Sequence, residues 1–387
     1  MQIITINGGR ILNNHKEFQQ SPSVQPLFQS YKVGNLSLSN RIVMAPMTRG
    51  FSPKGIPGPD VTAYYQRRAK NGVGLIITEG TLINHPAAGS NPNWPNFHTE
   101  DALKGWSQVV NAVHEAGGRI IPQLWHVGME RKIGDQPNPE ALPIGPSGLT
   151  LSGDQVTKPM TESEISAVID AYAQAAADAK ELGFDGVEIH GAHGYLIDQF
   201  FFGKTNQRTD CYGGNFIQRT RFAVEVIEAC RRAVGADFPI VLRFSQWKSG
   251  DYTAKLAETP EQLADFLAPL ADAGVDVFHC STRRFWEPEF EDSSLNLAGW
   301  TKKLTGKPTI TVGSVGLNSD IAKNPIEDRT TVNPQLNQLV ERLEKGEFDL
   351  VAVGRALLAD PEWVVKIRNG EMDQLIPYTP DALKELI

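Results

Sequence analysis

The sequence predicts a parallel α/β fold, a single (β/α)8 TIM barrel. Eight short apolar runs alternate with segments of helical periodicity along most of the chain. Uninterrupted alternation of this kind implies a parallel sheet, and a count of eight favours a closed barrel over an open sheet. Polar residues and glycines directly follow the apolar runs, at the strand ends where a barrel carries its active site.

The expected strands are short and are bounded by turn residues. They cover residues 41–45, 75–78, 120–124, 187–189, 240–244, 275–279, 309–312 and 350–353. Helices are expected at 61–70, 102–116, 161–182 and 217–234, with a further helix starting at residue 259. Thr161 and Glu164 have the spacing of a capping box, Pro260 suits a first helical turn, and Gly117 and Gly183 suit helix ends.

Two segments fall outside this repeat. Residues 1–25 are polar and irregular after a brief β-like start, and we interpret them as an N-terminal extension. Residues 26–387 form the barrel, with no composition break to suggest a second domain. Its longest loop follows the third strand and is rich in Pro and Gly.

Composition excludes several classes of protein. The 387 residues have a formal net charge of −8 with scattered Lys and Arg, so nucleic acid and acidic membrane surfaces are not expected partners. Three widely spaced cysteines without a CxxC pair favour a reducing compartment and neither a disulfide nor a zinc framework. No secretory signal is evident, and no run approaches the ~20 apolar residues of a membrane span. We expect a cytoplasmic protein, either a monomer or a homodimer.

The turn after the fourth strand concentrates chemically active side chains. His190, His193 and Tyr195 fall within six residues, separated by glycines. Two imidazoles and a phenol can donate hydrogen bonds to a developing oxyanion and supply a proton. The alternatives are that the histidines cap backbone groups or belong to a metal site.

The last two strand ends predict a phosphate site. Gly313 with Ser314 and Gly354 with Arg355 follow strands seven and eight, where glycines let backbone N–H groups approach a phosphate and an arginine can bind it. Such glycines also occur in ordinary tight turns.

Two further side chains at the carboxyl-terminal end of the predicted barrel suit a planar ligand. Gln123 and Arg243 are the groups that the pyrimidine edge of a flavin would use. A salt bridge from Arg243 to Glu188 is the structural alternative, and both can hold. No GxGxxG follows the first strand, so any nicotinamide cofactor would be a visiting substrate.

Several motifs, in order, resemble those of the old yellow enzymes, FMN-dependent ene-reductases of the (β/α)8 class. They are LSNRIVMAPMTR at 38–49, ITEGT at 77–81, QLWH at 123–126, EIHGAHGYLIDQF at 188–200, NQRTDCYGGNFIQRTRF at 206–222, and VGS plus VGRALLADP near the end. The similarity runs from about residue 27 to residue 369.

The resemblance implies roles for matching positions. Tyr195 would be the proton donor, His190 and His193 would bind the substrate oxygen, and Trp125 would form a wall of the substrate pocket. Thr48 would hydrogen-bond the flavin near its reactive nitrogen, where other members have cysteine. The remaining cofactor contacts would come from Pro46, Met47, Gly80, Gln123, Arg243, Gly313, Ser314, Gly354 and Arg355.

The resemblance also implies the reaction. NADPH or NADH would reduce a tightly bound, non-covalent FMN and leave, and an activated alkene would then accept a hydride and a proton from Tyr195. Enones, nitro compounds and quinones would all suit the same donors. Many members have asparagine where His193 stands, and both residue types can donate a hydrogen bond.

Parts of the chain depart from the family pattern. Met129 stands where a basic residue often occurs, and residues 127–158 form a loop with no clear counterpart. After strand six, we expect Phe285 or Trp286 to shape the substrate pocket and an arginine of this stretch to meet an anionic part of a visiting molecule. The alternative there is a surface cation–π cluster.

Rival interpretations remain. A related flavin dehydrogenase or dienoyl reductase would be expected to carry clustered cysteines for an iron–sulfur centre and a longer chain. A flavin-free lyase or isomerase could use His190 and Tyr195 as acid and base. An inactive FMN-binding barrel would not need all three residues of the turn.

Overall fold

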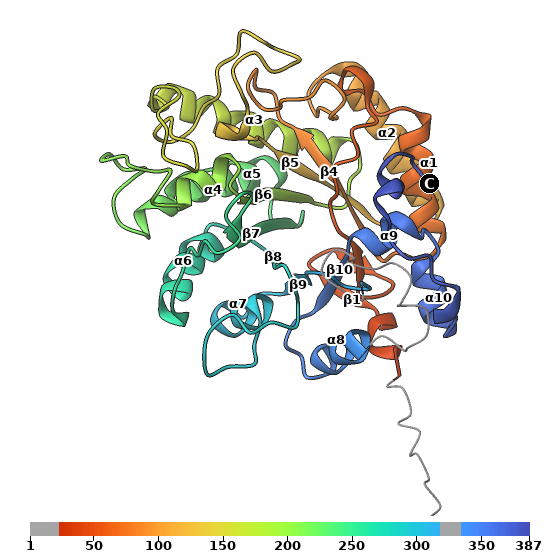
Figure 1. The fold of residues 1–387 in the computed structure, drawn as a ribbon. Helices are drawn as coiled ribbons and strands as arrows, with labels where there is room; N and C mark the ends of the chain where they lie inside the picture. Colours follow the sequence, from red (N-terminus) through yellow and green to blue (C-terminus); the bar gives the residue numbers. More distant parts are fainter. Residues whose placement is uncertain (1–22, 318–333) are drawn as a thin grey trace, which may run out of the picture.

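Eight parallel strands close into a barrel in the computed structural model, which describes residues 23–317 and 334–387 (Figure 1). Each strand pairs with the next in chain order, and the last pairs with the first. The strands are β3 (Ile42–Met44), β4 (Leu75–Leu82), β5 (Ile120–Trp125), β6 (Val187–His193), β7 (Ile240–Lys248), β8 (Val277–Ser281), β9 (Thr309–Val312) and β10 (Leu350–Val353). The (β/α)8 barrel expected from the sequence is therefore confirmed.

Helices surround the barrel, as the parallel connections require (Figure 1). They are α1 (Pro59–Lys70), α2 (Glu100–Glu115), α3 (Glu162–Glu181), α4 (Leu196–Phe201), α5 (Arg221–Val234), α6 (Pro260–Asp272), α7 (Leu297–Thr305), α8 (Pro334–Glu344), α9 (Arg355–Ala359) and α10 (Trp363–Asn369). The capping box of Thr161 and Glu164 is formed, and the Thr259 side chain caps α6. Single 3-10 turns are η1 (Gln25–Phe28), η2 (Pro53–Gly55), η3 (Gly128–Glu130), η4 (Gln218–Thr220), η5 (Met372–Gln374) and η6 (Pro380–Leu383).

Strand ends differ most from the sequence prediction. β7 continues to Lys248, beyond the expected end at residue 244, and β8 runs from 277 to 281, two residues later than expected. The apolar runs end early because side chains that point into the barrel become polar near its mouth, as Ser245 and Ser281 do. Residues 126–161 form the long loop after β5, drawn in yellow at the top of Figure 1, with η3 inside it.

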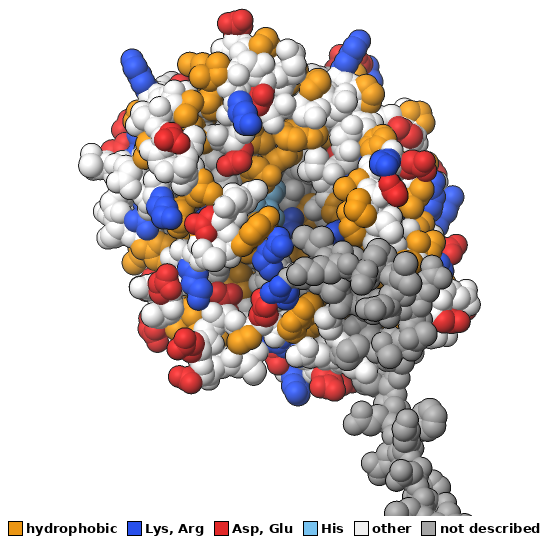
Figure 2. Space-filling model, viewed as in Figure 1, with side chains coloured by type: hydrophobic (Ala, Val, Ile, Leu, Met, Phe, Trp, Pro, Cys, Tyr) orange, Lys and Arg blue, Asp and Glu red, His pale blue; other side chains and the backbone are white. Residues whose placement is uncertain are grey.

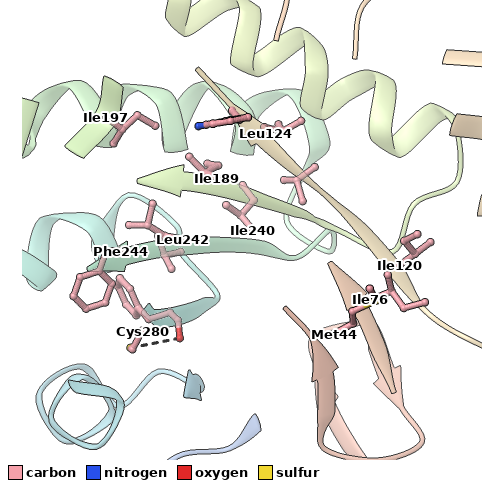
Figure 3. Packing of buried hydrophobic residues seen from close by; sticks show 14 of the residues in the cluster. Met44, Ile76, Ile120, Leu124, Ile189, Ile197, Ile240, Leu242, Phe244 and Cys280 are labelled. Atoms are coloured by element: carbon pink, nitrogen blue, oxygen red, sulfur yellow. Dashed lines mark hydrogen bonds between the residues drawn. The ribbon is translucent and has the colours of Figure 1, made fainter. Parts of the chain in front are cut away.

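Apolar side chains fill the barrel and coat its outside. Outside, residues such as Ile189, Leu242 and Phe244 point from neighbouring strands toward the helices (Figure 3). Inside, Ile121, Val241 and their neighbours form a second cluster that Val33, Leu36 and Leu38 complete.

These last three residues belong to an antiparallel hairpin that precedes the barrel, β1 (Tyr31–Val33) and β2 (Leu36–Leu38). The hairpin was not expected from the sequence. Because it joins the interior cluster and leads into the first residues of β3, it closes the amino-terminal end of the barrel. An active site is therefore expected at the opposite end, where the strands have their carboxyl ends.

The structure describes the C-terminal end of the chain but not its first 22 residues. Most of the predicted extension, residues 1–22, lies outside the described residues, so a boundary at residues 25 and 26 stays a prediction. At the other end, Arg67 donates a hydrogen bond to the carbonyl oxygen of Leu386 at 3.4 Å, and Arg68 to that of Ile387. The C-terminus therefore lies against α1 (Figure 1).

Candidate active site

Four aromatic side chains meet at the carboxyl ends of β5 and β6. The ring centroid of His190 lies 5.1 Å from that of His193 and 5.0 Å from that of Tyr195. Trp125 lies 5.0 Å from Tyr195, edge to face, and stacks on His190 at 6.2 Å. The structure thus brings together four residues named from the sequence, and their roles stay predictions.

The turn after β6 has a constrained backbone. His193 and Gly194 both have positive φ, +66° and +85°, a conformation that costs a non-glycine residue roughly 1–2 kcal/mol. Asp198 Oδ2 accepts a hydrogen bond from the Gly194 N–H at 2.6 Å, and Ser245 Oγ accepts one from the His193 N–H at 3.0 Å. Lys248 Nζ lies 2.9 Å from Asp198 Oδ1, with both side chains buried. A buried ion pair between α4 and β7 therefore supports the turn.

Both histidines are neutral at ordinary pH. Burial, followed by the charge of Arg243, holds the pKa of His190 and of His193 well below the usual value of 6.5. Nδ1 of His190 accepts from the Ala192 N–H at 3.3 Å, so its ring proton lies on Nε2. Nε2 of His193 lies 2.8 Å from Ser281 Oγ. Each imidazole can therefore serve as a neutral hydrogen-bond donor.

The phenol of Tyr195 is protonated. Burial, followed by the charge of Glu130, raises the pKa of Tyr195 above its usual value of 10.0. Among the residues that the structure describes, no group forms a hydrogen bond with its hydroxyl. The proton is therefore available to a bound molecule.

A buried carboxylate organises the barrel interior beneath these rings. Glu188 Oε1 accepts a hydrogen bond from Nε2 of Gln123 at 2.7 Å, and Glu188 Oε2 lies 2.6 Å from Nδ1 of His279. The salt bridge from Arg243 to Glu188, which was the structural alternative to flavin binding, does not form, although Glu188 attracts the guanidinium charge. Nη2 of Arg243 lies 3.5 Å from Ser281 Oγ, and its buried Nε has no partner. Arg243 therefore keeps donors for a bound group.

A pocket of about 220 Å³ opens beside this cluster. Figure 2 shows a hollow on this face, with a histidine at its floor and Lys or Arg side chains along its edge. The residues named from the sequence that line the pocket are Pro46, Met47, His193, Arg243, Gly313, Ser314, Gly354 and Arg355. The predicted phosphate turns and His193, one of the two predicted oxyanion donors, therefore face one space, and His190 adjoins it through its contact with His193.

The lining fits a phosphate and a planar ring. Gly313 has φ +148°, and a Cβ there would lie 2.6 Å from Thr282 Oγ1, so the turn requires glycine. A Cβ at Gly354 would have Met47 Sδ as its nearest protein atom, at 3.6 Å, and would instead occupy the pocket. Arg355 forms no ion pair with a carboxylate of residues 23–317 or 334–387, so its donors suit a phosphate. The unpartnered Nε of Arg243 suits the electron-rich edge of a flavin in the same way.

Three predicted cofactor positions do not line the pocket: Thr48, Gly80 and Gln123, the last of which is bonded to Glu188. Thr48 is exposed on the loop after β3, beside Arg49, whose N–H donates to Glu79 Oε2 at 2.8 Å. Gly80 lies on β4, where a Cβ would come within 2.5 Å of the Trp125 ring. Glycine at this position therefore lets Trp125 pack closely against the strand.

Trp286 is not brought to the pocket. Its ring packs edge to face on Phe285, with centroids 5.2 Å apart, and it is absent from the pocket lining. Trp247 lines the pocket and stacks on His193 at 4.3 Å. Trp247 was missed because the fifth strand was predicted to end at residue 244, whereas it continues to Lys248.

Sequence reasoning also missed polar partners inside the strands. His279 and Ser281 point into the barrel on β8, whereas Phe278 and Cys280 point outward. This alternation is the signal that could have identified them. Lys248 carried no such signal, because its partner Asp198 lies on a different element.

The sequence profile of the NADH:flavin oxidoreductase / NADH oxidase family matches residues 26–374. The chain belongs to this family. Membership confirms the resemblance to the old yellow enzymes and makes the chain an oxidoreductase of that type.

Curated and solved relatives agree with this family. A putative 12-oxophytodienoate reductase 2 of Oryza sativa subsp. japonica is 36% identical over 343 residues, covering 87% of this chain and 85% of that protein. Morphinone reductase in complex with tetrahydroNAD superposes with a TM-score of 0.77 at 30% identity, covering 92% of this chain and 93% of the other. Old Yellow Enzyme from Pichia sp. AKU4542 has a TM-score of 0.76 at 26% identity, covering 92% and 90%.

One relative of the family is longer. The NADH oxidase of Thermoanaerobacter brockii is 33% identical over 358 residues, covering 90% of this chain, yet the chain spans only 52% of that protein.

Three other features bear on the predictions made from composition. All three cysteines are free, and Cys211 is exposed. Within the described residues, no three His, Cys, Asp or Glu side chains gather as a metal site would require. In the same part of the chain, no helix is both long and apolar enough to cross a bilayer.

Proposed function

We propose that this family member is an FMN-dependent ene-reductase that uses NADH or NADPH to reduce the C=C bond of activated alkenes. The observation that carries the proposal is one cluster of side chains beside the pocket, in which His190 and His193 are neutral donors and Tyr195 is a protonated acid. Two relatives are named as reductases of 12-oxophytodienoate and of morphinone. Enones are the first substrates to test, with nitro compounds and quinones after them.

The residues that would hold FMN divide into two groups. The backbone of Gly313, Ser314 and Gly354 and the side chain of Arg355 would bind its phosphate, while Gln123 and Arg243 would bind the pyrimidine edge of its ring. The cofactor contacts proposed for packing and hydrogen bonding are Pro46, Met47, Thr48 and Gly80. A bound FMN would supply the hydride-transfer chemistry that links the nicotinamide to the β-carbon of the alkene.

The protein's own groups activate the alkene. His190 and His193 donate hydrogen bonds to the electron-withdrawing oxygen, so negative charge that develops there is stabilised. Each such donor lowers the barrier by roughly 3 kcal/mol, by analogy with oxyanion holes. Tyr195 donates its proton to the α-carbon, which is strongly basic once the β-carbon has been attacked. Trp125 and Trp247 wall the space in which the alkene would lie.

The test is the visible absorption spectrum of the purified protein. Flavin bands should be present, should bleach on anaerobic addition of NADPH or NADH, and should return on addition of cyclohexenone. A colourless protein whose bands are not restored by FMN would contradict the proposal and favour a flavin-free lyase or isomerase. Comparing NADH with NADPH in the same experiment identifies the preferred donor.

The compartment and assembly are separate proposals. The exposed free thiol of Cys211 supports a reducing compartment, and we propose the cytoplasm. Localisation of a tagged chain in its host tests this. Light scattering tests whether the protein is a monomer or a homodimer.

A further inference from the structure

Arg283 lies on the loop after β8, and its backbone is tied to the proposed phosphate turn. Ser314 Oγ donates a hydrogen bond to the carbonyl oxygen of Arg283 at 3.0 Å. The N–H of Phe285 donates to the carbonyl oxygen of Gly313 at 3.1 Å. The backbone at Arg283 therefore lies next to the turn that would bind phosphate. The side chain of Arg283 lines the same pocket.

The guanidinium of Arg283 lies beside two aromatic rings, those of Tyr252 and Trp247. Its Cζ lies 4.2 Å from the ring centroid of Tyr252 and 5.8 Å from that of Trp247. Trp247 stacks in turn on His193 at 4.3 Å, and its Nε1 donates to the carbonyl oxygen of Ser281 at 3.1 Å. A stacked guanidinium still has in-plane N–H groups to donate.

Charge around Arg283 favours an anion. Within the described residues it forms no ion pair with a carboxylate. Burial lowers the pKa of Arg355, and the nearby charge of Arg283 lowers it further. The neighbouring Arg284 differs, because its Nη1 lies 2.6 Å from Glu287 Oε1. Two like charges facing one pocket repel each other until an anion binds there.

The phosphate of FMN and a phosphate group bound by Arg283 would lie at different places in the pocket. The cofactor phosphate is proposed to lie on Gly313, Ser314 and Arg355, whereas Cζ of Arg283 lies 4.2 Å from the ring centroid of Tyr252, which is 58% exposed. A group bound there would be near the surface, at the outer end of the ring stack that leads to His193. A long molecule with one end at His193 would place its other end at this outer position.

We propose that Arg283, supported by Tyr252 and Trp247, binds the diphosphate of the visiting NADH or NADPH. The inference rests on the proposed function and adds a coenzyme-binding residue to it. A diphosphate carries the negative charge that the unpaired guanidinium requires, whereas a simple enone carries none.

The test compares Arg283→Met with Arg284→Met, which loses the same charge one residue away. Binding of tetrahydroNAD, which cannot give up a hydride, is measured by calorimetry on the FMN-loaded proteins. Arg283→Met should weaken binding by about tenfold, the order expected for one charge-assisted hydrogen bond, and Arg284→Met by much less. The reduction rate is then measured with NADH and with 1-benzyl-1,4-dihydronicotinamide, which has no phosphate. The loss in Arg283→Met should be confined to NADH.

Each other outcome is decisive. Equal affinity of wild type and Arg283→Met for tetrahydroNAD would overturn the inference. Weaker retention of FMN in Arg283→Met, measured by ultrafiltration, would also overturn it and would assign Arg283 to the cofactor phosphate. If neither dihydronicotinamide reduces the wild-type protein, the proposed function itself fails, and the inference fails with it.

Discussion

At the scale of single residues, Tyr195 combines two properties that an acid at this position needs. Its pKa is raised by burial and by Glu130, so the proton stays on the oxygen at neutral pH. Its hydroxyl has no hydrogen-bond partner among the described residues, so no group in that part of the chain competes with a substrate for the proton. His190 and His193, whose pKa values are lowered instead, remain neutral and act as donors.

Tyr195→Phe should separate the two halves of the reaction. Reoxidation of the reduced protein by cyclohexenone should slow by roughly 10²- to 10⁴-fold, the contribution of a positioned general acid. Reduction by NADH should change little, because no proton from Tyr195 is needed. Stopped-flow absorbance measures both rates. Tyr212→Phe, which removes a hydroxyl bonded to Glu225, is the matched control.

The pH dependence of this step follows from the same shift. Because the pKa of Tyr195 lies above 10.0, the wild-type reoxidation rate should stay level from pH 7 to pH 9. A rate that falls through pH 8 would argue against the phenol as the acid.

At the scale of elements, the site depends on ties between neighbouring strand ends. The pair of Asp198 on α4 and Lys248 on β7 supports the strained turn after β6. Burial raises the pKa of Asp198 and lowers that of Lys248, so each charge depends on the other.

Lys248→Met should therefore destabilise the protein by about 3–5 kcal/mol, because it leaves a buried carboxylate unpaired. Asp198→Asn combined with Lys248→Met should be more stable than Lys248→Met alone. Urea unfolding measures both. Lys104→Met is the control, since Lys104 pairs with Glu100 on an exposed surface and its loss should not shift the midpoint. If Lys248→Met and Lys104→Met unfold alike, the buried pair does not support the turn.

A second tie links β4 to the loop that carries Thr48. Glu79 Oε2 accepts hydrogen bonds from the N–H groups of Arg49 and Gly50, at 2.8 and 3.1 Å. Burial nevertheless raises the pKa of Glu79 from 4.5 to about 7. Between these values the folded protein keeps a proton that the unfolded chain has lost. The contribution of Glu79 to the free energy of unfolding is therefore fully present below pH 4.5 and is lost as the pH rises through 7.

Glu79→Gln should remove this dependence while keeping an oxygen to accept the two hydrogen bonds. From pH 5 to pH 8, the free energy of unfolding of Glu79→Gln should rise relative to wild type by about 2.5 kcal/mol. Urea titrations at several pH values measure the difference. A constant difference would show that Glu79 does not titrate in this range.

At the scale of the whole molecule, the barrel was predictable because its signals are local. Strand and helix periodicity, the capping box at Thr161 and the glycines after helices need no knowledge of distant contacts. The cluster of His190, His193 and Tyr195 was predictable for the same reason, since six residues contain it. The ring of Trp247 on His193 and the bond from Glu188 to His279 could not be predicted, because they depend on where separate strands end and which way their side chains point.

The closed barrel also separates stability from chemistry along its axis. Leu38, in the hairpin at the amino-terminal end, is 2% exposed and packs in the interior cluster with residues such as Val43 and Ile310. The pocket of His193 and Arg243 lies at the opposite end. A cavity at Leu38 should therefore weaken the fold without reaching the pocket.

Leu38→Ala should lower the free energy of unfolding by about 2–5 kcal/mol, the usual cost of a buried leucine. FMN retention and both half-reaction rates at 25 °C should stay within twofold of wild type, because the variant remains folded there. Ser37→Ala, one residue away and exposed, should change neither stability nor rates. If Leu38→Ala slows alkene reduction as Tyr195→Phe does, the interior must transmit packing changes along the barrel, and the hairpin would belong to the catalytic apparatus.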